Sequence, residues 1–278
     1  MTQNHDSRFG PLSGDHPVLE ITDATLSFPG TTLWTGLNLS VAPHEFIAVI
    51  GANGSGKTSL MKAILGQEQL TYGSILLNGK PVTRGNNRVG YIPQQRSSDA
   101  GTPLRAKDML RLGFDGHLLG LPWPSKKAKA RVNHILNCVD ARDLADKPIG
   151  ELSGGQVQRL RVGQAVIGEP DLILADEPLS ALDLAQQKIV AELLDTERKE
   201  HNCAVLFVTH DVNPILGMVD RVLYLANGQF RIGTPDEVLR SDVLSELYGT
   251  PVDVVRNQGR IVVLGTQDHD HHPEEVWS

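Results

Sequence analysis

The chain has 278 residues, with 26 Lys and Arg against 33 Asp and Glu, so its formal net charge is −7. At roughly 150 residues per domain, this length allows one large domain or two small ones and excludes a small disulfide-held scaffold. The negative charge gives no overall attraction to nucleic acid or anionic lipid, although a local basic groove is compatible with it. The longest uninterrupted apolar run, 46–52, is far shorter than the about 18 residues of a membrane-spanning helix. The start of the chain is polar and only two cysteines are present, so we expect a cytoplasmic protein that does not cross a membrane by itself.

Apolar patterns predict two kinds of strand. Apolar residues alternate over 19–28 and 37–41, as in strands with one buried face, and we expect these two strands to pair antiparallel. The runs 46–50, 172–175 and 204–208 are continuously apolar and bounded by turn residues, which is typical of parallel strands covered on both faces. Hairpin turns are predicted at the two Asn-Gly pairs that separate short apolar runs, Asn78-Gly79 and Asn227-Gly228.

Residues 102–168 show helical periodicity instead. Thr102 before Pro103 is a suitable N-cap for a first helix, and apolar residues recur at helical spacing after Ser125. The recurring residues are Ala128, Val132, Ile135, Leu136 and Val139. The pattern predicts a helical subdomain, over about 96–168, inserted into an α/β core.

The C-terminal part predicts a small extension. The segment 234–237 (Thr-Pro-Asp-Glu) is a capping box with proline at the first helical position, and a second helix is expected to end before Gly249. Residues 252–255 and 261–264 are expected to pair as a hairpin. We therefore divide the chain into a disordered leader (1–17), a main domain (18–266, with the extension from about 232) and a His- and acid-rich tail (267–278).

Residues 51–58 (Gly-Ala-Asn-Gly-Ser-Gly-Lys-Thr) match G-x-x-x-x-G-K-[ST] directly after an apolar strand and before a helical stretch. In such a P-loop the glycines let backbone N–H groups surround an anion, and the following helix adds its positive end. Lys57 offers a charge to the β- and γ-phosphates, and Thr58 offers a hydroxyl to Mg²⁺. The alternative is a glycine-rich turn without a ligand. The expected ATP-binding residues here are Gly51, Ala52, Asn53, Gly54, Ser55, Gly56, Lys57, Thr58 and Ser59.

Two acids at the end of an apolar strand form a second candidate. Asp176 and Glu177 follow 172–175, and ligands bind at the ends of strands in α/β sheets. Asp176 suits Mg²⁺ through water and Glu177 suits a general base, whereas the alternative is that the pair caps a helix at Ser180. A third apolar strand ends in Thr209-His210, which could place an imidazole beside the same γ-phosphate, although a histidine after a strand is more often structural.

The segment 152–156 (Leu-Ser-Gly-Gly-Gln) also matches a capping box, with Ser153 reaching forward and Gln156 reaching back. Capping alone does not explain two glycines in a first helical turn, each of which costs roughly 1 kcal/mol relative to alanine. Bare backbone amides at a helix start allow a ligand to approach closely, so the pattern predicts a second phosphate-seeking helix N-terminus.

Together these motifs resemble the ATP-binding cassette (ABC) ATPases, the motor subunits of ABC transporters. The resemblance runs from about Val18 to Leu264, with five motifs in the family's order. They are the loop 51–58, the signature 152–156, the pair Asp176-Glu177, the segment 180–183 and His210. The resemblance implies an α/β P-loop NTPase fold, with an ABC ATPase core, an antiparallel β subdomain and an inserted α-helical subdomain, and it implies hydrolysis of ATP with Mg²⁺.

The family's motifs also carry over individual residues. Phe28 matches the aromatic residue that stacks on adenine, with a core residue as the alternative. Gln94, after Pro93, matches the glutamine that contacts Mg²⁺ and the attacking water. One departure is 162–165 (Val-Gly-Gln-Ala), which replaces the usual Ala-Arg-rich helix and affects no catalytic residue. The implied catalytic residues are Glu177, His210, Gln94 and Lys57, and the implied Mg²⁺ residues are Thr58, Gln94 and Asp176.

The resemblance further implies a head-to-tail homodimer, in which each ATP lies between the P-loop of one subunit and the Ser153 helix of the other. The residues expected to act in trans are Ser153, Gly154, Gly155, Gln156 and Asp183. A single motif set without a membrane span implies separate permease subunits, an extracellular substrate-binding protein acting indirectly, and a place on the cytoplasmic face of the membrane. The alternative is a soluble ABC ATPase acting on ribosomes or DNA, but we find neither a second cassette nor a long coiled coil, and expect no nucleic-acid partner.

Two weaker signals concern the substrate. Residues 232–252 are similar to the corresponding part of zinc, manganese and siderophore-iron importer ATPases. In the tail, His269, His271 and His272 alternate with carboxylates and suit Zn²⁺, Ni²⁺ or Mn²⁺, whereas the alternative is a solvated tail without function. We therefore expect a divalent-metal importer, for zinc or manganese, with a siderophore-iron importer as the alternative.

Overall fold

A computed structural model describes residues 16–94, 102–116 and 126–265. Its centre is a six-stranded sheet in the order β10-β9-β3-β8-β7-β6. Five strands are parallel and β10 runs antiparallel to β9 at one edge. The strands are β3 (Phe46–Gly51), β6 (Val89–Ile92), β7 (Leu172–Asp176), β8 (Ala204–Val208), β9 (Arg221–Ala226) and β10 (Gln229–Gly233). Every residue of β3, β7 and β8 is buried, so the three predicted parallel strands are confirmed.

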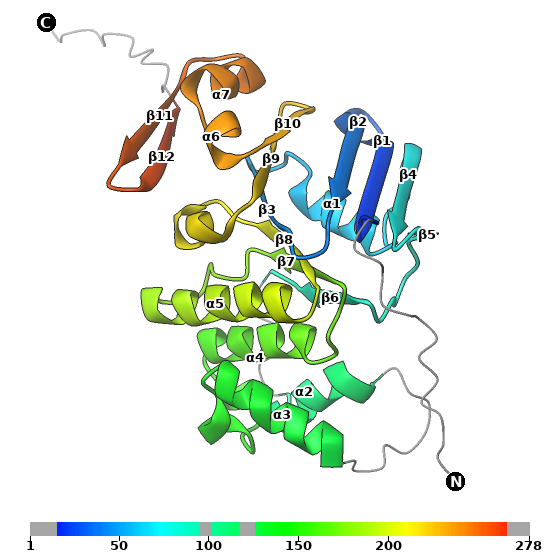
Figure 1. Cartoon of the computed structure of the whole chain (residues 1–278), viewed down its shortest axis with the longest axis vertical. Helices are drawn as coiled ribbons and strands as arrows, with labels where there is room; N and C mark the ends of the chain where they lie inside the picture. The colour runs from blue at the N-terminus through cyan, green and yellow to red at the C-terminus, as the bar shows by residue number, and fades with distance from the viewer. Residues whose placement is uncertain (1–15, 95–101, 117–125, 266–278) are drawn as a thin grey trace, which may run out of the picture.

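A second, four-stranded antiparallel sheet has the order β2-β1-β4-β5 (Figure 1). Its strands are β1 (Leu19–Phe28), β2 (Thr31–Val41), β4 (Tyr72–Leu77) and β5 (Lys80–Pro81), and the antiparallel pairing of β1 with β2 confirms the prediction. Helix α1 (Lys57–Ile64) shares one apolar core with this sheet and one face of the central sheet. Both predicted Asn-Gly turns are present, between β4 and β5 and between β9 and β10.

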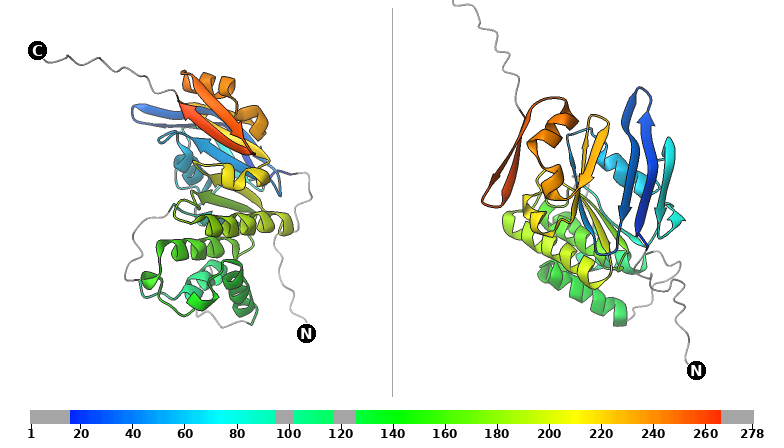
Figure 2. Two further views of the ribbon diagram at one scale, coloured as in Figure 1. Left: turned by 90° about the vertical axis from the view of Figure 1, so that its left-hand side faces the viewer. Right: turned by 45° about the horizontal axis from the view of Figure 1, so that its top comes forward.

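The other face of the central sheet packs on helices. Helix α5 (Leu184–Glu200) and the helical subdomain share the second core with this face. The subdomain contains α2 (Ala106–Asp115), α3 (Lys126–Cys138), α4 (Gly154–Val166) and the short 3₁₀ turns η1 (Arg142–Leu144) and η2 (Ile149–Glu151). It lies at the opposite end of the molecule from the C-terminal extension (Figures 1 and 2).

The predicted N-cap at Thr102 is wrong. Helix α2 begins at Ala106 with Arg105 as its N-cap, and the residues before it are not helical. The carbonyls of Thr102 and Leu104 accept hydrogen bonds from Gly150 N (3.2 Å) and Ile149 N (2.8 Å). Tertiary hydrogen bonds therefore hold this segment extended and override the local capping signal.

The C-terminal extension agrees with its predicted elements. Helix α6 (Pro235–Val238) starts with the full capping box of Thr234 and Glu237, and α7 (Ser241–Tyr248) ends at Gly249 in the left-handed conformation. Strands β11 (Val252–Asn257) and β12 (Arg260–Gly265) form the expected hairpin. Most of the predicted leader and the tail with His269, His271 and His272 lie outside the described residues. In the ranges that are described, no helix is long and apolar enough to cross a membrane.

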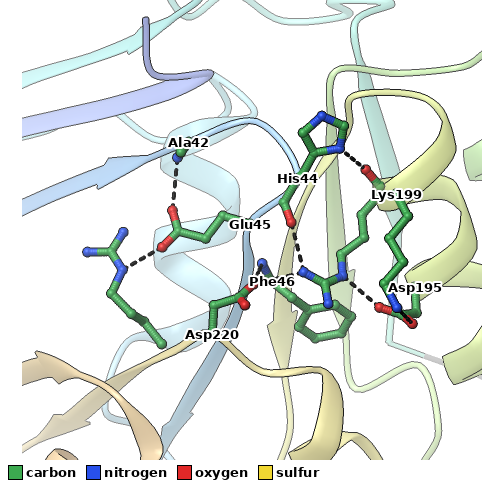
Figure 3. Close-up of polar contacts among 9 residues, drawn as sticks. Ala42, His44, Glu45, Phe46, Asp195, Lys199 and Asp220 are labelled. Atoms are coloured by element: carbon green, nitrogen blue, oxygen red, sulfur yellow. Dashed lines mark hydrogen bonds and ion pairs between the residues drawn. The ribbon is translucent and has the colours of Figure 1, made fainter. Parts of the chain in front are cut away.

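A polar network at the start of β3 joins α5 to the central sheet (Figure 3). Asp220 Oδ2 accepts from Phe46 N and from Arg198 Nη1, both at 2.8 Å. Asp195 in turn accepts from Arg198 Nε at 2.7 Å and from Lys199 Nζ at 2.6 Å. These contacts join the start of β3, the C-terminal part of α5 and the residue before β9.

Candidate functional site

The loop 51–58 joins β3 to α1, as its motif predicts. Gly51 and Gly56 have φ angles of 150° and 96°, and a Cβ at these positions would lie 2.0 Å from Leu225 O and 2.8 Å from Trp34 Nε1. Only glycine therefore fits the tight path of the loop. Gly56 is the N-cap of α1 and supplies no side-chain cap, so the amides of the first turn are left to an anionic ligand.

Lys57 lies folded over this loop. Its ammonium is buried and donates to Gly51 O (2.7 Å) and Ala52 O (2.8 Å). Burial lowers the pKa of Lys57 below its ordinary value, while the carboxylates of Glu177 and Asp176 act in the opposite direction. Because these acceptors are backbone carbonyls, the ammonium can turn to phosphate without breaking a salt bridge within the described part of the chain.

The loop also contains an unpaired polar atom. Ser55 Oγ is buried and has no hydrogen-bond partner among the described residues. An orphaned hydroxyl, an uncapped helix start and a buried ammonium in one loop fit an anionic ligand with several acceptor oxygens, as in a nucleotide triphosphate.

Three polar side chains meet at the carboxyl ends of neighbouring strands. Glu177 follows β7, His210 follows β8 and Gln94 follows β6. Glu177 Oε1 lies 2.5 Å from His210 Nε2, and Glu177 Oε2 accepts from Gln94 Nε2 at 2.9 Å. Both oxygens of the predicted base are therefore held by predicted site residues. Glu177 has φ 50°, a left-handed conformation that is uncommon for a residue with a side chain.

The residues predicted for Mg²⁺ line one cavity of about 280 Å³. Thr58 enters it from α1, Asp176 from β7 and Gln94 from β6, and Asp176 is only 2% exposed. A hydroxyl, a carboxylate and an amide oxygen are the hard oxygen donors that Mg²⁺ prefers, so the residues fit this ion. Arg161 of α4 lines the same cavity, and the sequence did not predict this although Arg161 directly precedes the unusual segment 162–165.

The signature residues cap α4 at the surface. Ser153 Oγ accepts from Gln156 N (3.3 Å) and Gln156 Oε1 accepts from Ser153 N (3.0 Å), which confirms the capping box. A Cβ at Gly155 would lie 2.9 Å from Gln186 Oε1 of α5, which is the end of a flexible side chain, so packing alone does not require glycine there. Gly154 is exposed.

Two remaining predicted residues have clear places. Phe28 ends β1 and is 42% exposed, so it is available for stacking and is not a core residue. Asp183 is exposed and is the N-cap of α5, where Asp183 Oδ1 accepts from Gln186 N at 2.9 Å. The alternative in which Asp176 and Glu177 cap a helix at Ser180 is therefore wrong, since the helix starts later and has its own cap.

A P-loop between a parallel strand and a helix, acids at the end of the neighbouring strand and a glycine-rich helix start define a nucleotide-hydrolysing ATPase of the P-loop class. The ABC transporter family matches residues 34–180, and the chain belongs to this family. It is an ATPase that binds and hydrolyses ATP, and the predicted family and fold class are confirmed.

Similar proteins span most of the chain. The zinc import ATP-binding protein ZnuC of Roseobacter denitrificans is 32% identical over 84% of this chain and 85% of its own length. The protein of the same name from Halorhodospira halophila is 28% identical over 94% of this chain and 93% of its own length. Among solved structures, an inward-facing putative metal-chelate type ABC transporter matches with a TM-score of 0.75 and 26% identity, covering 91% of this chain and 99% of that one. An ATP-binding cassette in a dimeric post-hydrolysis state with ADP and Pi shares the fold, with a TM-score of 0.69 and 24% identity over 78% of this chain and 98% of its own.

Proposed function

We propose that this chain is the ATP-hydrolysing motor subunit of an ABC importer for a divalent metal, zinc or manganese. The observation that supports the proposal is the similarity to two zinc import ATP-binding proteins, which covers 84% and 94% of this chain. A siderophore-iron importer is the second candidate, favoured by the similarity to a metal-chelate type transporter.

In the proposed mechanism the P-loop amides and Lys57 bind the phosphates of ATP. Lys57 Nζ leaves the carbonyls of Gly51 and Ala52, to which it now donates, and turns to the β- and γ-phosphate oxygens. Phe28 offers its exposed ring to the adenine.

Glu177 acts as general base and takes the proton of the attacking water on its carboxylate. His210 and Gln94, which contact its two oxygens, hold the carboxylate in orientation, and His210 also steadies charge on the γ-phosphate. Thr58, Gln94 and Asp176 would hold Mg²⁺, which supplies charge neutralisation at the phosphates when bound.

The exposed N-terminus of α4 serves the partner subunit in a head-to-tail homodimer. Ser153 and Gly154 lie at the surface, where the amides of the helix start can complete the γ-phosphate site of the other subunit. Gly155, Gln156 and Asp183 belong to the same surface. Binding of two ATP molecules closes the dimer and hydrolysis opens it.

The closing dimer drives integral membrane permease subunits, to which this chain is peripheral on the cytoplasmic face. An extracellular substrate-binding protein acts indirectly and, with the permease, determines which metal is carried. In the tail, His269, His271 and His272 alternate with carboxylates and form a proposed metal site of imidazole and carboxylate ligands. Calorimetry of Zn²⁺ binding to the full chain and to the chain without 267–278 tests this site, and equal binding would remove it.

The substrate is tested on the complex reconstituted with its permease and binding protein. Uptake and stimulated ATP hydrolysis are measured with Zn²⁺, Mn²⁺, Ni²⁺ and ferric siderophores. We expect stimulation and uptake with Zn²⁺ or Mn²⁺. Stimulation by a ferric siderophore alone would favour a siderophore-iron importer instead. If the complex hydrolyses ATP but takes up none of these substrates, the importer assignment is wrong.

A further inference from the structure

The loop that carries His210 is held by its own polar side chains on both sides of the histidine. Before it, Thr209 Oγ1 donates to Asp211 O (2.7 Å) and accepts from Asp211 N (3.1 Å). After it, Asp211 Oδ1 accepts from Asn213 N (2.9 Å) and from Asn213 Nδ2 (2.7 Å). Because His210 itself is about half exposed, its position depends on this backbone rather than on packing of its ring.

Asn213 also leaves the loop and binds the C-terminal hairpin. Its Nδ2 donates to Ile261 O at 2.9 Å and its Oδ1 accepts from Ile261 N at 2.8 Å, across 48 residues of sequence. Both donors of the amide and its oxygen are therefore engaged, which fixes its orientation. The Asn213 side chain thus pairs with the backbone of Ile261 as a neighbouring strand at the edge of β12 would.

A second polar anchor holds the same hairpin from the other side. Ser245 of α7 accepts from Val252 N (2.9 Å) and donates to Val252 O (3.3 Å). Like Asn213, it gives one donor and one acceptor to the backbone of a single hairpin residue. Among the described hydrogen bonds, Ser245 has no contact with the His210 loop. Asn213 therefore connects the hairpin to this loop, whereas Ser245 connects it only to α7.

We propose that Asn213 is a positioning residue for His210, and that the hairpin β11–β12 is thereby a supporting element of the hydrolysis site. The hairpin backbone fixes the Asn213 amide, the amide fixes Asp211, and Asp211 with Thr209 sets where His210 lies. This chain of contacts keeps His210 Nε2 within 2.5 Å of Glu177 Oε1. The inference rests on the proposed role of His210 in hydrolysis.

The test compares Asn213→Ala with Ser245→Ala in the full-length protein. For Asn213→Ala we expect kcat to fall about tenfold, because small displacements of reacting groups are costly, while the equilibrium affinity for ATP stays the same since the P-loop is untouched. For Ser245→Ala we expect kcat to stay within about twofold of the wild type. We expect both variants to lose a similar amount of thermal stability, because each loses one anchor of the hairpin. Equal losses of kcat in both variants would overturn the inference, because they would show that any loosening of the hairpin has the same result.

A double-mutant cycle with His210→Ala adds a readout that a merely structural role would not change. If Asn213 acts through His210, the Asn213→Ala substitution has little further effect on kcat in the His210→Ala background. The same fall of about tenfold in both backgrounds would contradict the proposal. Unchanged turnover in His210→Ala alone would instead remove His210 from the mechanism, which identifies a failure of the proposed function. Asn213→Asp, which keeps the acceptor for Ile261 N, replaces Asn213→Ala in the cycle if the alanine variant does not fold.

Discussion

The two glycine-rich helix N-termini of this protein, those of α1 and α4, differ in capping and exposure. Helix α1 has Gly56 as its N-cap, in the left-handed conformation and without a side-chain cap, and the buried Lys57 beside it donates to two backbone carbonyls. Helix α4 has Ser153 as its N-cap, with extended backbone and a complete capping box, and Ser153 and Gly154 are exposed. One N-terminus is open toward a ligand inside its own subunit, and the other is stable by itself and faces outward.

The difference shows how one fold can provide two phosphate-seeking ends with separate duties. A helix N-terminus without a side-chain cap leaves amides available to an anion, so we propose that the start of α1 serves ATP binding. The capped, exposed N-terminus of α4 is stable without a ligand, so we propose that it binds the nucleotide of a partner subunit. Substitutions at the two ends should therefore separate ATP binding from ATP hydrolysis.

The largest effect is expected for Ser153→Arg, which places a long side chain where the γ-phosphate of the partner subunit should lie. We expect hydrolysis and ATP-driven dimerisation to be abolished while the monomer still binds ATP, measured by turnover, light scattering and equilibrium binding. Mixing this variant with Lys57→Ala gives heterodimers with one intact composite site and one lacking both residues. Activity above that of either variant supports shared sites, and crosslinking of position 153 to the partner's P-loop checks the geometry if activity stays absent.

Glu177→Gln should have the next largest effect, because it keeps the size of the side chain but removes the proton acceptor. We expect turnover to fall about 100-fold or more with ATP binding retained and the ATP-bound dimer persistent. The control is Glu192→Gln, at an exposed glutamate of α5. Turnover within threefold of the wild type, where roughly 100-fold was expected, would exclude Glu177 as the base.

Lys57→Ala should affect ATP binding at the N-terminus of α1 and leave the N-terminus of α4 unchanged. Removing the ammonium deprives the phosphates of a charge, so we expect ATP affinity to fall about tenfold, which is roughly 1.4 kcal/mol. Equilibrium binding of ATP without hydrolysis measures this, with the exposed Lys188→Ala as the control. Unchanged affinity together with unchanged hydrolysis would show that the loop does not bind the phosphates.

The smallest effect concerns the cap itself. Ser153→Ala removes the acceptor for Gln156 N, so we expect the free energy of unfolding to fall by about 1 kcal/mol in chemical denaturation. Thr234→Ala, which breaks the corresponding box of α6, should cost a similar amount without lowering turnover. Helix α1 has no such cap to lose, and a Ser153→Ala variant as stable as the wild type would show that the contrast between the two helix starts is unimportant for folding.

Local patterns were reliable where a few adjacent residues decide the structure. The strand 46–50, the loop 51–58 and the capping boxes at Ser153 and Thr234 all form as predicted. Thr102 failed because its carbonyl bonds to Gly150, a partner that no local pattern contains.

The sequence by itself determined the class of the fold, the P-loop and the acids after the buried strand, because strand, loop and helix follow one another within short stretches of chain. Only the tertiary structure decided that Glu177 is held by both His210 and Gln94, that Arg161 lines the cavity with Asp176, and that Asn213 binds Ile261. These contacts join residues that lie up to 83 positions apart. Their distances depend on the order and alignment of the parallel strands, which arise from packing of the whole core rather than from any local pattern.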